Sequence, residues 1–276
     1  MSAHDQPYVH GTSPREQARL GLMNDILNTG AIRALEVTHG ERVLDLGTGL
    51  GQLTRAMARA AGPKGKVVGI ERSPEQLREA ERLAREAGEQ GLVDFRHGDA
   101  TAPPLRDEEW GTFDLAHTRF LLEHLARPVD LVRVMVRAVG PGGRIVVEDE
   151  DHEILRLWPE PPGLMAVWRA YIRSYEERGT DPSVGRKLVA LLREAGAEPC
   201  RCDWVFFGGC AGEVRFEPLV ENLARILEGA EESIVATGMA QAAQVRSAVA
   251  ALRTWGERPD AALWYAVACV EGVRPG

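Results

Sequence analysis

A run of glycines and a nearby carboxylate are the residues of this chain whose types and spacing most clearly favour ligand binding. Residues 43–51 read VLDLGTGLG, so Gly47, Gly49 and Gly51 alternate directly after an apolar run and before a helical pattern. Glycines allow a backbone to turn sharply and to approach a ligand closely. Such a loop predicts, by itself, only that a nucleotide-like ligand binds.

Two details of the loop narrow the kind of ligand. The dinucleotide fingerprint has a third glycine three residues after the second, and the chain has Gln52 at that position. Asp45 precedes the first glycine by two residues, where it would repel a pyrophosphate and suit an ammonium or sulfonium charge. The loop therefore favours a cationic nucleoside, and an NAD(P)-dependent oxidoreductase is the alternative.

Further polar residues fall at the predicted carboxyl ends of successive strands, namely Glu71, Asp99, His117 and Asp149. These ends share one edge of an open α/β sheet, where ligands bind. Glu71 lies twenty positions after Gly51, where a ribose-binding acid is expected. The convergence predicts one site. Each acid also has a purely structural alternative. Asp45 could be a strand-end carboxylate held by backbone donors, Glu71 an exposed acid that opens a helix, and Asp99 part of a Gly-Asp turn.

The elements that must position these residues alternate between strand and helix patterns from residue 41 onward, which is typical of a parallel sheet with helices on both faces. The predicted strands are 42–46, 66–71, 92–96, 113–117, 143–148, 200–208 and 261–270. The predicted helices are 52–61, 74–87, 128–138, 163–178, 184–195, 218–228 and 239–255. We expect one domain, 1–276, made of an N-terminal helical lid (1–38), a cofactor-binding half (39–150) and a segment with the substrate-capping helices and the last two strands (151–276).

Across residues 40–150 the chain resembles a class I S-adenosylmethionine-dependent methyltransferase. The similar motifs are, in order, DLGTGLG, IERSPEQL, HGDAT, FDLAHTRFLLEHL and VGPGGRIVVED. Within that superfamily the chain is similar to the small-molecule branch, which includes ubiquinone/menaquinone-type and bacterial natural-product enzymes. The resemblance implies a Rossmann-like α/β fold with a seven-stranded, mostly parallel sheet, an antiparallel last strand, an N-terminal lid and helical cap insertions.

The resemblance also implies that S-adenosylmethionine is the cofactor, with Glu71 at the ribose hydroxyls and Asp99 at the adenine amino group. The residues predicted to bind it are Tyr8, Arg19, Asp45, Gly47, Thr48, Gly49, Gly51, Glu71, Arg72, Asp99, Ala100 and His117. Arg19 could pair with the methionine carboxylate or could be a surface arginine of an amphipathic helix.

Methyl transfer from a sulfonium depends mainly on alignment of the reactants and exclusion of water, and a base is needed only for some acceptors. His117 and His124 are the predicted bases because they flank the loop where relatives often place substrate contacts; each could instead be a packing residue. The residues predicted to contact the substrate are His10, Arg119, Phe120, Trp168, Tyr171 and Tyr175. The last three share a helix face and could line a pocket or pack against the sheet.

Composition excludes several partners. The net charge of −8 argues against a nucleic acid or an anionic membrane surface. A pocket lined by aromatic residues would suit a small, aromatic or hydrophobic acceptor, which we expect as the substrate. The acidic run at 148–153 could bind a divalent ion, but an acidic strand exit is favoured and no metal is predicted. A noncatalytic module that binds S-adenosylmethionine is a further alternative, and a homodimer is expected for this size.

The four cysteines, Cys200, Cys202, Cys210 and Cys269, form no CxxC pair. Their alternation predicts small buried groups on strands rather than zinc ligands. Together with the absence of a signal-peptide pattern, they lead us to expect a reducing cytoplasm.

Overall fold

The computed structural model describes residue 28 and residues 30–276, which divide into two compact units. The sheet unit comprises described residues up to 150, with 184–205 and 267–276. The helical unit comprises 151–183 and 206–266. The chain thus leaves the sheet unit after residue 150, where the sequence predicted the end of the cofactor-binding half, and later returns to it twice.

The sheet unit is built on parallel strands in the order β3-β2-β1-β4-β5. Their bounds are β1 Arg42–Leu46, β2 Lys66–Glu71, β3 Val93–His97, β4 Phe113–Arg119 and β5 Val139–Glu150. Strand β8 (Ala262–Val273) pairs antiparallel with β5, and β7 (Glu198–Cys210) pairs with β8. The register places Asp45 opposite His117, and Arg119 opposite Glu148. The sheet therefore aligns these polar side chains across neighbouring strands.

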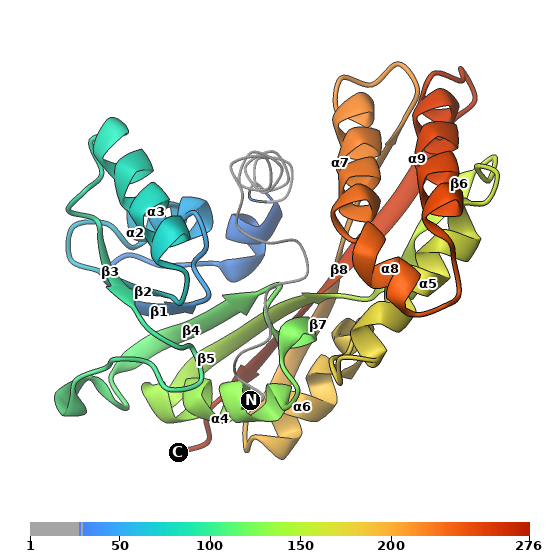
Figure 1. The fold of residues 1–276 in the computed structure, drawn as a ribbon. Helices are drawn as coiled ribbons and strands as arrows, with labels where there is room; N and C mark the ends of the chain where they lie inside the picture. The colour runs from blue at the N-terminus through green and yellow to red at the C-terminus, as the bar shows by residue number, and fades with distance from the viewer. Residues whose placement is uncertain (1–27, 29) are drawn as a thin grey trace. The chain divides into compact units, whose positions relative to one another are not determined.

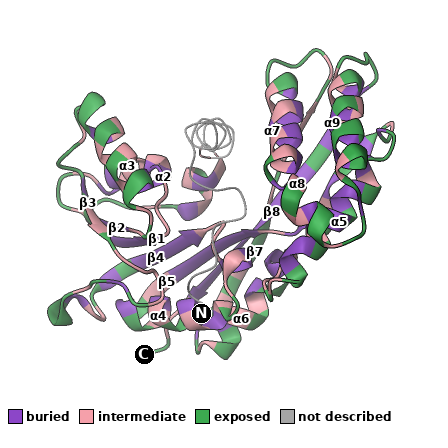
Figure 2. Cartoon of the chain, in the orientation of Figure 1, coloured by how far each residue is buried: buried purple, intermediate pink, exposed green. Residues whose placement is uncertain are grey.

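Helices cover both faces of this sheet, and the strands between them are buried (Figures 1 and 2). Because successive strand residues point to opposite faces, Leu44 packs with α4 (Pro128–Ala138) and α6 (Leu188–Glu194). Val43 packs on the other face with α2 (Gln52–Ala61). Helix α3 (Pro74–Glu86) contacts β2 and β3, and its N-terminus is capped by the Ser73 side chain. Asp45 thus lies on the face covered by α2.

The helical unit has its own apolar core. Its helices are α5 Leu164–Glu176, α7 Phe216–Gly229, α8 Glu231–Ala236 and α9 Ala242–Gly256. Helices α7 and α9 lie side by side (Figure 1). The ring centres of Phe216 on α7 and Trp255 on α9 are 5.7 Å apart. A short 3-10 turn occupies His152–Ile154 in this unit, and three others, at Asp107–Glu109, Leu122–His124 and Val184–Lys187, belong to the sheet unit.

The fold class predicted from the sequence is confirmed, including the antiparallel last strand. The described sheet has eight strands rather than seven, because the three-residue β6 (Arg156–Trp158) pairs with β8 and is too short to produce a pattern. The helix predicted at 184–195 begins as a 3-10 turn and continues as α6. Among the described helices, none has the length and apolarity needed to cross a membrane.

The prediction of buried cysteines is confirmed for Cys269 and wrong for the other three. Cys200, Cys202 and Cys210 all lie on β7 and are exposed. Every residue of that strand is exposed or half-buried, so alternation along it does not imply burial.

Candidate functional site

The glycine loop between β1 and α2 has the backbone that the sequence predicts. Gly47, Gly49 and Gly51 have φ angles of 81°, 55° and 69°, in the left-handed region that favours glycine. The amides of Gly47 and Thr48 donate to the carbonyl oxygen of Ile70 on β2, at 2.9 and 3.0 Å. The loop is therefore fixed to the neighbouring strand in a conformation that side chains would strain.

Glu71 closes the loop from the end of β2. Its Oε2 accepts a hydrogen bond from the Gly49 amide at 2.9 Å, and its Oε1 accepts one from the Ser73 amide at 2.8 Å. Burial raises the pKa of Glu71, although these backbone N–H groups and the charge of Arg72 act in the opposite direction. A carboxylate so placed, beside a glycine turn, fits the vicinal hydroxyls of a ribose. The side chain of Arg72 is exposed.

Asp99 lies just after β3, as predicted. Its Oδ1 accepts hydrogen bonds from both the amide and the hydroxyl of Thr101, each at 2.7 Å. This local turn fixes the carboxyl group at the carboxyl edge of the sheet, and Ala100 is half-buried beside it. Asp99 therefore forms the Gly-Asp turn that the sequence offered as its structural role. Its contact with the adenine amino group stays a prediction.

Asp45 and His117 are joined in the interior, beneath the glycine loop. The His117 Nδ1 lies 2.7 Å from Asp45 Oδ1, and the His117 Nε2 lies 3.4 Å from Glu148 Oε1 on β5. Thr54 on α2 donates its hydroxyl to Asp45 Oδ2 at 2.5 Å and also contacts the hydroxyl of Thr48. The predicted cofactor residues Asp45, Thr48 and His117 thus belong to one polar chain.

The environment of His117 determines its charge. Burial alone would lower the pKa of His117, but the hydrogen-bonding and charge effects of Asp45 and Glu148 outweigh it and raise that pKa to about 9. Burial would raise the pKa of Glu148, but His117 beside it lowers that pKa overall. An imidazole that is already protonated cannot accept a proton from a substrate, so this geometry disfavours His117 as the base.

The loop after β4 lies directly against the glycine loop. A Cβ atom on Gly47 would come within 2.9 Å of Leu121 Cδ2. Phe120 has a φ of 55°, which is strained for an aromatic residue, and its amide donates to the Glu148 carbonyl oxygen at 3.0 Å. Asp149 holds the following turn, because its Oδ2 accepts from the Leu122 amide at 2.8 Å. Backbone strain of this kind is often found at functional sites.

His124 ends this turn and is half-buried, with its Nε2 3.5 Å from Glu123 Oε1. Arg119 donates from Nη2 to Asn28 Oδ1 at 2.8 Å, and its guanidinium lies 5.2 Å from the centre of the Phe120 ring. The structure therefore places Arg119 at the end of β4, and Phe120 and His124 in the segment that follows it, where Leu121 approaches the glycine turn.

The predicted aromatic substrate contacts lie in the core of the helical unit. Trp168, Tyr171 and Tyr175 are buried, and their rings surround His152 at 5.4–5.5 Å. The hydroxyls of Tyr171 and Tyr175 are 2.9 Å apart, and Trp168 Nε1 donates to the His152 carbonyl oxygen at 2.8 Å. Of the two readings left open by the sequence, the geometry favours packing.

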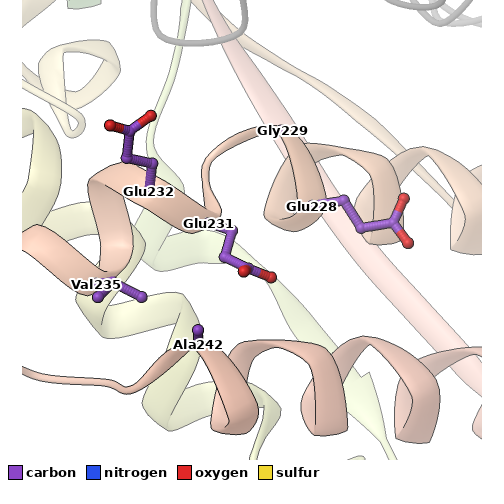
Figure 3. A pocket seen from close by; sticks show the side chains of 6 residues that line it. All are labelled: Glu228, Gly229, Glu231, Glu232, Val235 and Ala242. Carbon is purple, nitrogen blue, oxygen red and sulfur yellow. The ribbon is translucent and has the colours of Figure 1, made fainter.

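The helical unit also has an open hollow of about 640 Å³, whose lining residues are shown in Figure 3. Its Glu228 pairs with Arg253 and its Glu231 with Arg246, each at 2.7 Å. None of the predicted site residues that the structure describes lines it. The remaining predicted contacts, Tyr8, His10 and Arg19, lie outside the described residues.

Sequence reasoning missed Thr54 and the pairing role of Glu148. A signal for Thr54 is a hydroxyl among the apolar positions of α2, where its neighbours Leu53, Met57 and Ala58 are buried. No comparable signal marks Glu148, because the acidic run at 148–153 does not reveal which member faces the interior.

The strand order, the glycine loop after β1 and the acid at the end of β2 define a class I methyltransferase fold. Residues 38–177, about half of the chain, match the family described as "Methyltransferase domain". The chain belongs to this family of S-adenosylmethionine-dependent methyltransferases, and S-adenosylmethionine is its cofactor. The glycine cradle and the Glu71 carboxylate fit that cofactor.

Relatives and solved structures agree with this assignment. The chain is 34% identical over 138 residues to the ubiquinone/menaquinone biosynthesis C-methyltransferase UbiE of Pseudomonas savastanoi pv. phaseolicola, covering 47% of this chain and 53% of that protein. The chain spans about half the length of the curated relatives it matches.

Two solved structures share the fold. A putative methyltransferase from Bacillus halodurans has a TM-score of 0.59 at 16% identity, covering 90% of this chain and 99% of that one. A geranyl diphosphate methyltransferase, in complex with GPP and sinefungin, has a TM-score of 0.54 at 16% identity. The match covers 91% of this chain and 78% of that one.

Proposed function

We propose that this protein transfers the methyl group of S-adenosylmethionine to a small, aromatic or hydrophobic metabolite, such as a quinone-like or secondary-metabolite acceptor. The observation that carries the proposal is the contact between Glu71 and the Gly49 amide, because it joins a ribose-binding acid to the glycine turn. The family match supports the same conclusion.

The cofactor supplies the activated methyl group, and the residues of the chain bind and orient. The glycine loop offers a turn against which the amino-acid end of the cofactor can lie, with Glu71 and Asp99 at the sugar and the base. The loop that carries Phe120 and Leu121 lies over Gly47 and would exclude water there.

Three features support a small acceptor. The net charge of −8 disfavours a polyanion such as a nucleic acid. One relative is a methyltransferase of ubiquinone/menaquinone biosynthesis and one similar structure is a geranyl diphosphate methyltransferase, and quinones and geranyl diphosphate are hydrophobic in part. The half-buried Phe120 beside the glycine turn offers an aromatic surface to such a molecule.

His124 is the better placed of the two predicted bases. It belongs to the turn that follows β4, whereas both ring nitrogens of His117 face buried carboxylates. For an acceptor that must lose a proton, we expect His124→Ala to lower turnover at saturating cofactor by about 10²-fold or more. His39→Ala, which changes an exposed histidine, is the matched control.

The test has two stages. Isothermal titration calorimetry should show that S-adenosylmethionine binds and that NADH does not, which separates the proposal from an oxidoreductase. Production of S-adenosylhomocysteine is then followed with hydroquinones, phenols and indoles, and with transfer RNA for comparison. Binding without turnover on any small acceptor would identify a noncatalytic module, and turnover on the RNA alone would refute the small-molecule assignment.

A further inference from the structure

Three ionisable side chains are buried side by side within the sheet unit. Asp45, His117 and Glu148 are 3%, 1% and 2% exposed and lie on β1, β4 and β5. All three point to the face that α2 covers, since each stands two residues from an apolar neighbour of that face, at positions 43, 115 and 146. Burying three such groups is costly unless their charges compensate one another.

The geometry shows which atoms can compensate. Each ring nitrogen of His117 faces a carboxylate oxygen, at 2.7 Å for Asp45 and 3.4 Å for Glu148. A neutral imidazole carries a proton on only one nitrogen, so its other lone pair would point at a carboxylate. A doubly protonated ring places a positive charge between two negative ones.

The other groups around His117 agree with this charge. Arg119, two residues along β4, is the second cation near Glu148 and Asp45. From α2 the neighbour is the neutral Thr54, and from β8 it is the Cys269 thiol, whose pKa is raised by burial. Two carboxylates are thus balanced by an imidazolium and a guanidinium.

The polar chain leads from these charges to the glycine loop. Asp45 uses Oδ1 for His117 and Oδ2 for the Thr54 hydroxyl, which in turn contacts the hydroxyl of Thr48. Gly69 on β2 leaves room for these two side chains, because a Cβ there would come within 3.2 Å of the Thr54 methyl carbon and 3.3 Å of the Thr48 hydroxyl oxygen. Thr48 is part of the loop itself.

We propose that His117 is a positioning residue, a buried imidazolium that holds Asp45 and, through Thr54, fixes Thr48 in the glycine loop for cofactor binding. Its effect on the cofactor rests on the function proposed above. Its protonation state does not, and can be measured on the cofactor-free protein.

The first experiment measures that state. In protein labelled with ¹⁵N-histidine, the His117 signals are assigned as those lost in His117→Asn. We expect both ring nitrogens of His117 to carry protons between pH 6 and pH 8. A neutral His117 ring at pH 7, with the proton on Glu148 or absent, would overturn the proposal.

The second experiment measures the consequence. We expect His117→Leu to raise the Kd and KM for S-adenosylmethionine at least about tenfold, while kcat falls less than about threefold. His117→Asn keeps an N–H donor for Asp45 and should restore most of the affinity, and His39→Asn is the control. A large loss of kcat with unchanged Kd would instead identify His117 as a base and refute the positioning role.

The two failures are distinguishable. Wild-type protein that binds no S-adenosylmethionine would refute the proposed function, and the NMR result would still decide whether His117 is an imidazolium. Wild-type protein that binds the cofactor, with His117→Leu binding it equally well, would refute the positioning role alone.

Discussion

The amide of Gly49 donates a hydrogen bond to the carboxylate of Glu71 across 2.9 Å, from the loop after β1 to the end of β2. The two residues are 22 positions apart in sequence, and the parallel pairing of β1 with β2 brings them together. The same carboxylate also accepts from Ser73, the residue that caps α3. One side chain therefore connects the glycine turn to the next helix.

Replacing Glu71 with alanine should weaken the binding of S-adenosylmethionine strongly. Both the ribose contacts and the hydrogen bond that holds Gly49 would be lost, and hydrogen bonds to charged groups contribute about 1.5–3 kcal/mol each. We expect a rise in Kd of about 10- to 100-fold by calorimetry, and a smaller rise for Glu71→Gln. Glu75→Ala removes a nearby, exposed acid and should leave Kd within about twofold, so an equal effect of both would contradict the assigned role of Glu71.

The parts of the site that depend on strand order were predictable from the sequence. The three loop glycines, Gly47, Gly49 and Gly51, follow the end of β1, and Glu71 ends β2. Parallel strands bring their carboxyl ends to one edge of the sheet, regardless of how the side chains pack. The buried charge chain was not predictable, because it depends on which face Glu148 and Thr54 present and on the register between β4 and β5.

The aromatic residues illustrate the same limit. Helical spacing placed Trp168, Tyr171 and Tyr175 on one face, as the structure shows. Spacing cannot tell a core-facing stripe from a ligand-facing one, and in the structure the stripe packs around His152.

Gly51→Ala should destabilise the fold more than Gly88→Ala. Both glycines have a φ of 69°, so both substitutions carry a left-handed strain of about 1–2 kcal/mol. A Cβ at Gly51 would also lie 2.7 Å from the Phe95 ring, whereas a Cβ at Gly88 would have no neighbour within 4 Å. Urea denaturation should show an additional loss of about 1–3 kcal/mol for Gly51→Ala. Equal losses would mean that Phe95 moves aside freely.

The stability of the protein should fall as pH rises through the pKa of His117. Hydrogen bonds and charges raise that pKa from 6.5 to about 9. The folded state therefore holds the proton more tightly than the unfolded state, and the stabilisation is complete below pH 6.5 and lost above pH 9. Urea unfolding at pH 6 and pH 9.5 should differ by up to about 3 kcal/mol from this residue. His117→Asn should lack that difference and His39→Asn should retain it. If His117→Asn kept the same pH dependence of stability, that dependence would belong to other groups.

Glu109 should stabilise the fold through its charge, whereas its neighbour Glu108 should not. The two oxygens of Glu109 face two nitrogens of Arg96 at 2.7 and 2.8 Å, and Oε1 also accepts from Arg106 at 2.8 Å. The side chain of Glu109 is 5% exposed and that of Glu108 is 70% exposed.

These partners, chiefly Arg96, hold the pKa of Glu109 far below its usual range. Its stabilisation is therefore present above about pH 4.5 and is lost as pH falls further. At pH 7 we expect Glu109→Gln to lower the free energy of unfolding by about 2–4 kcal/mol, because a largely buried guanidinium loses its charge partner. Glu108→Gln should change it by less than about 0.5 kcal/mol. Urea titrations of both variants decide the matter, and a small effect at Glu109 would show that Asp94 alone, 2.6 Å from Arg96, satisfies that arginine.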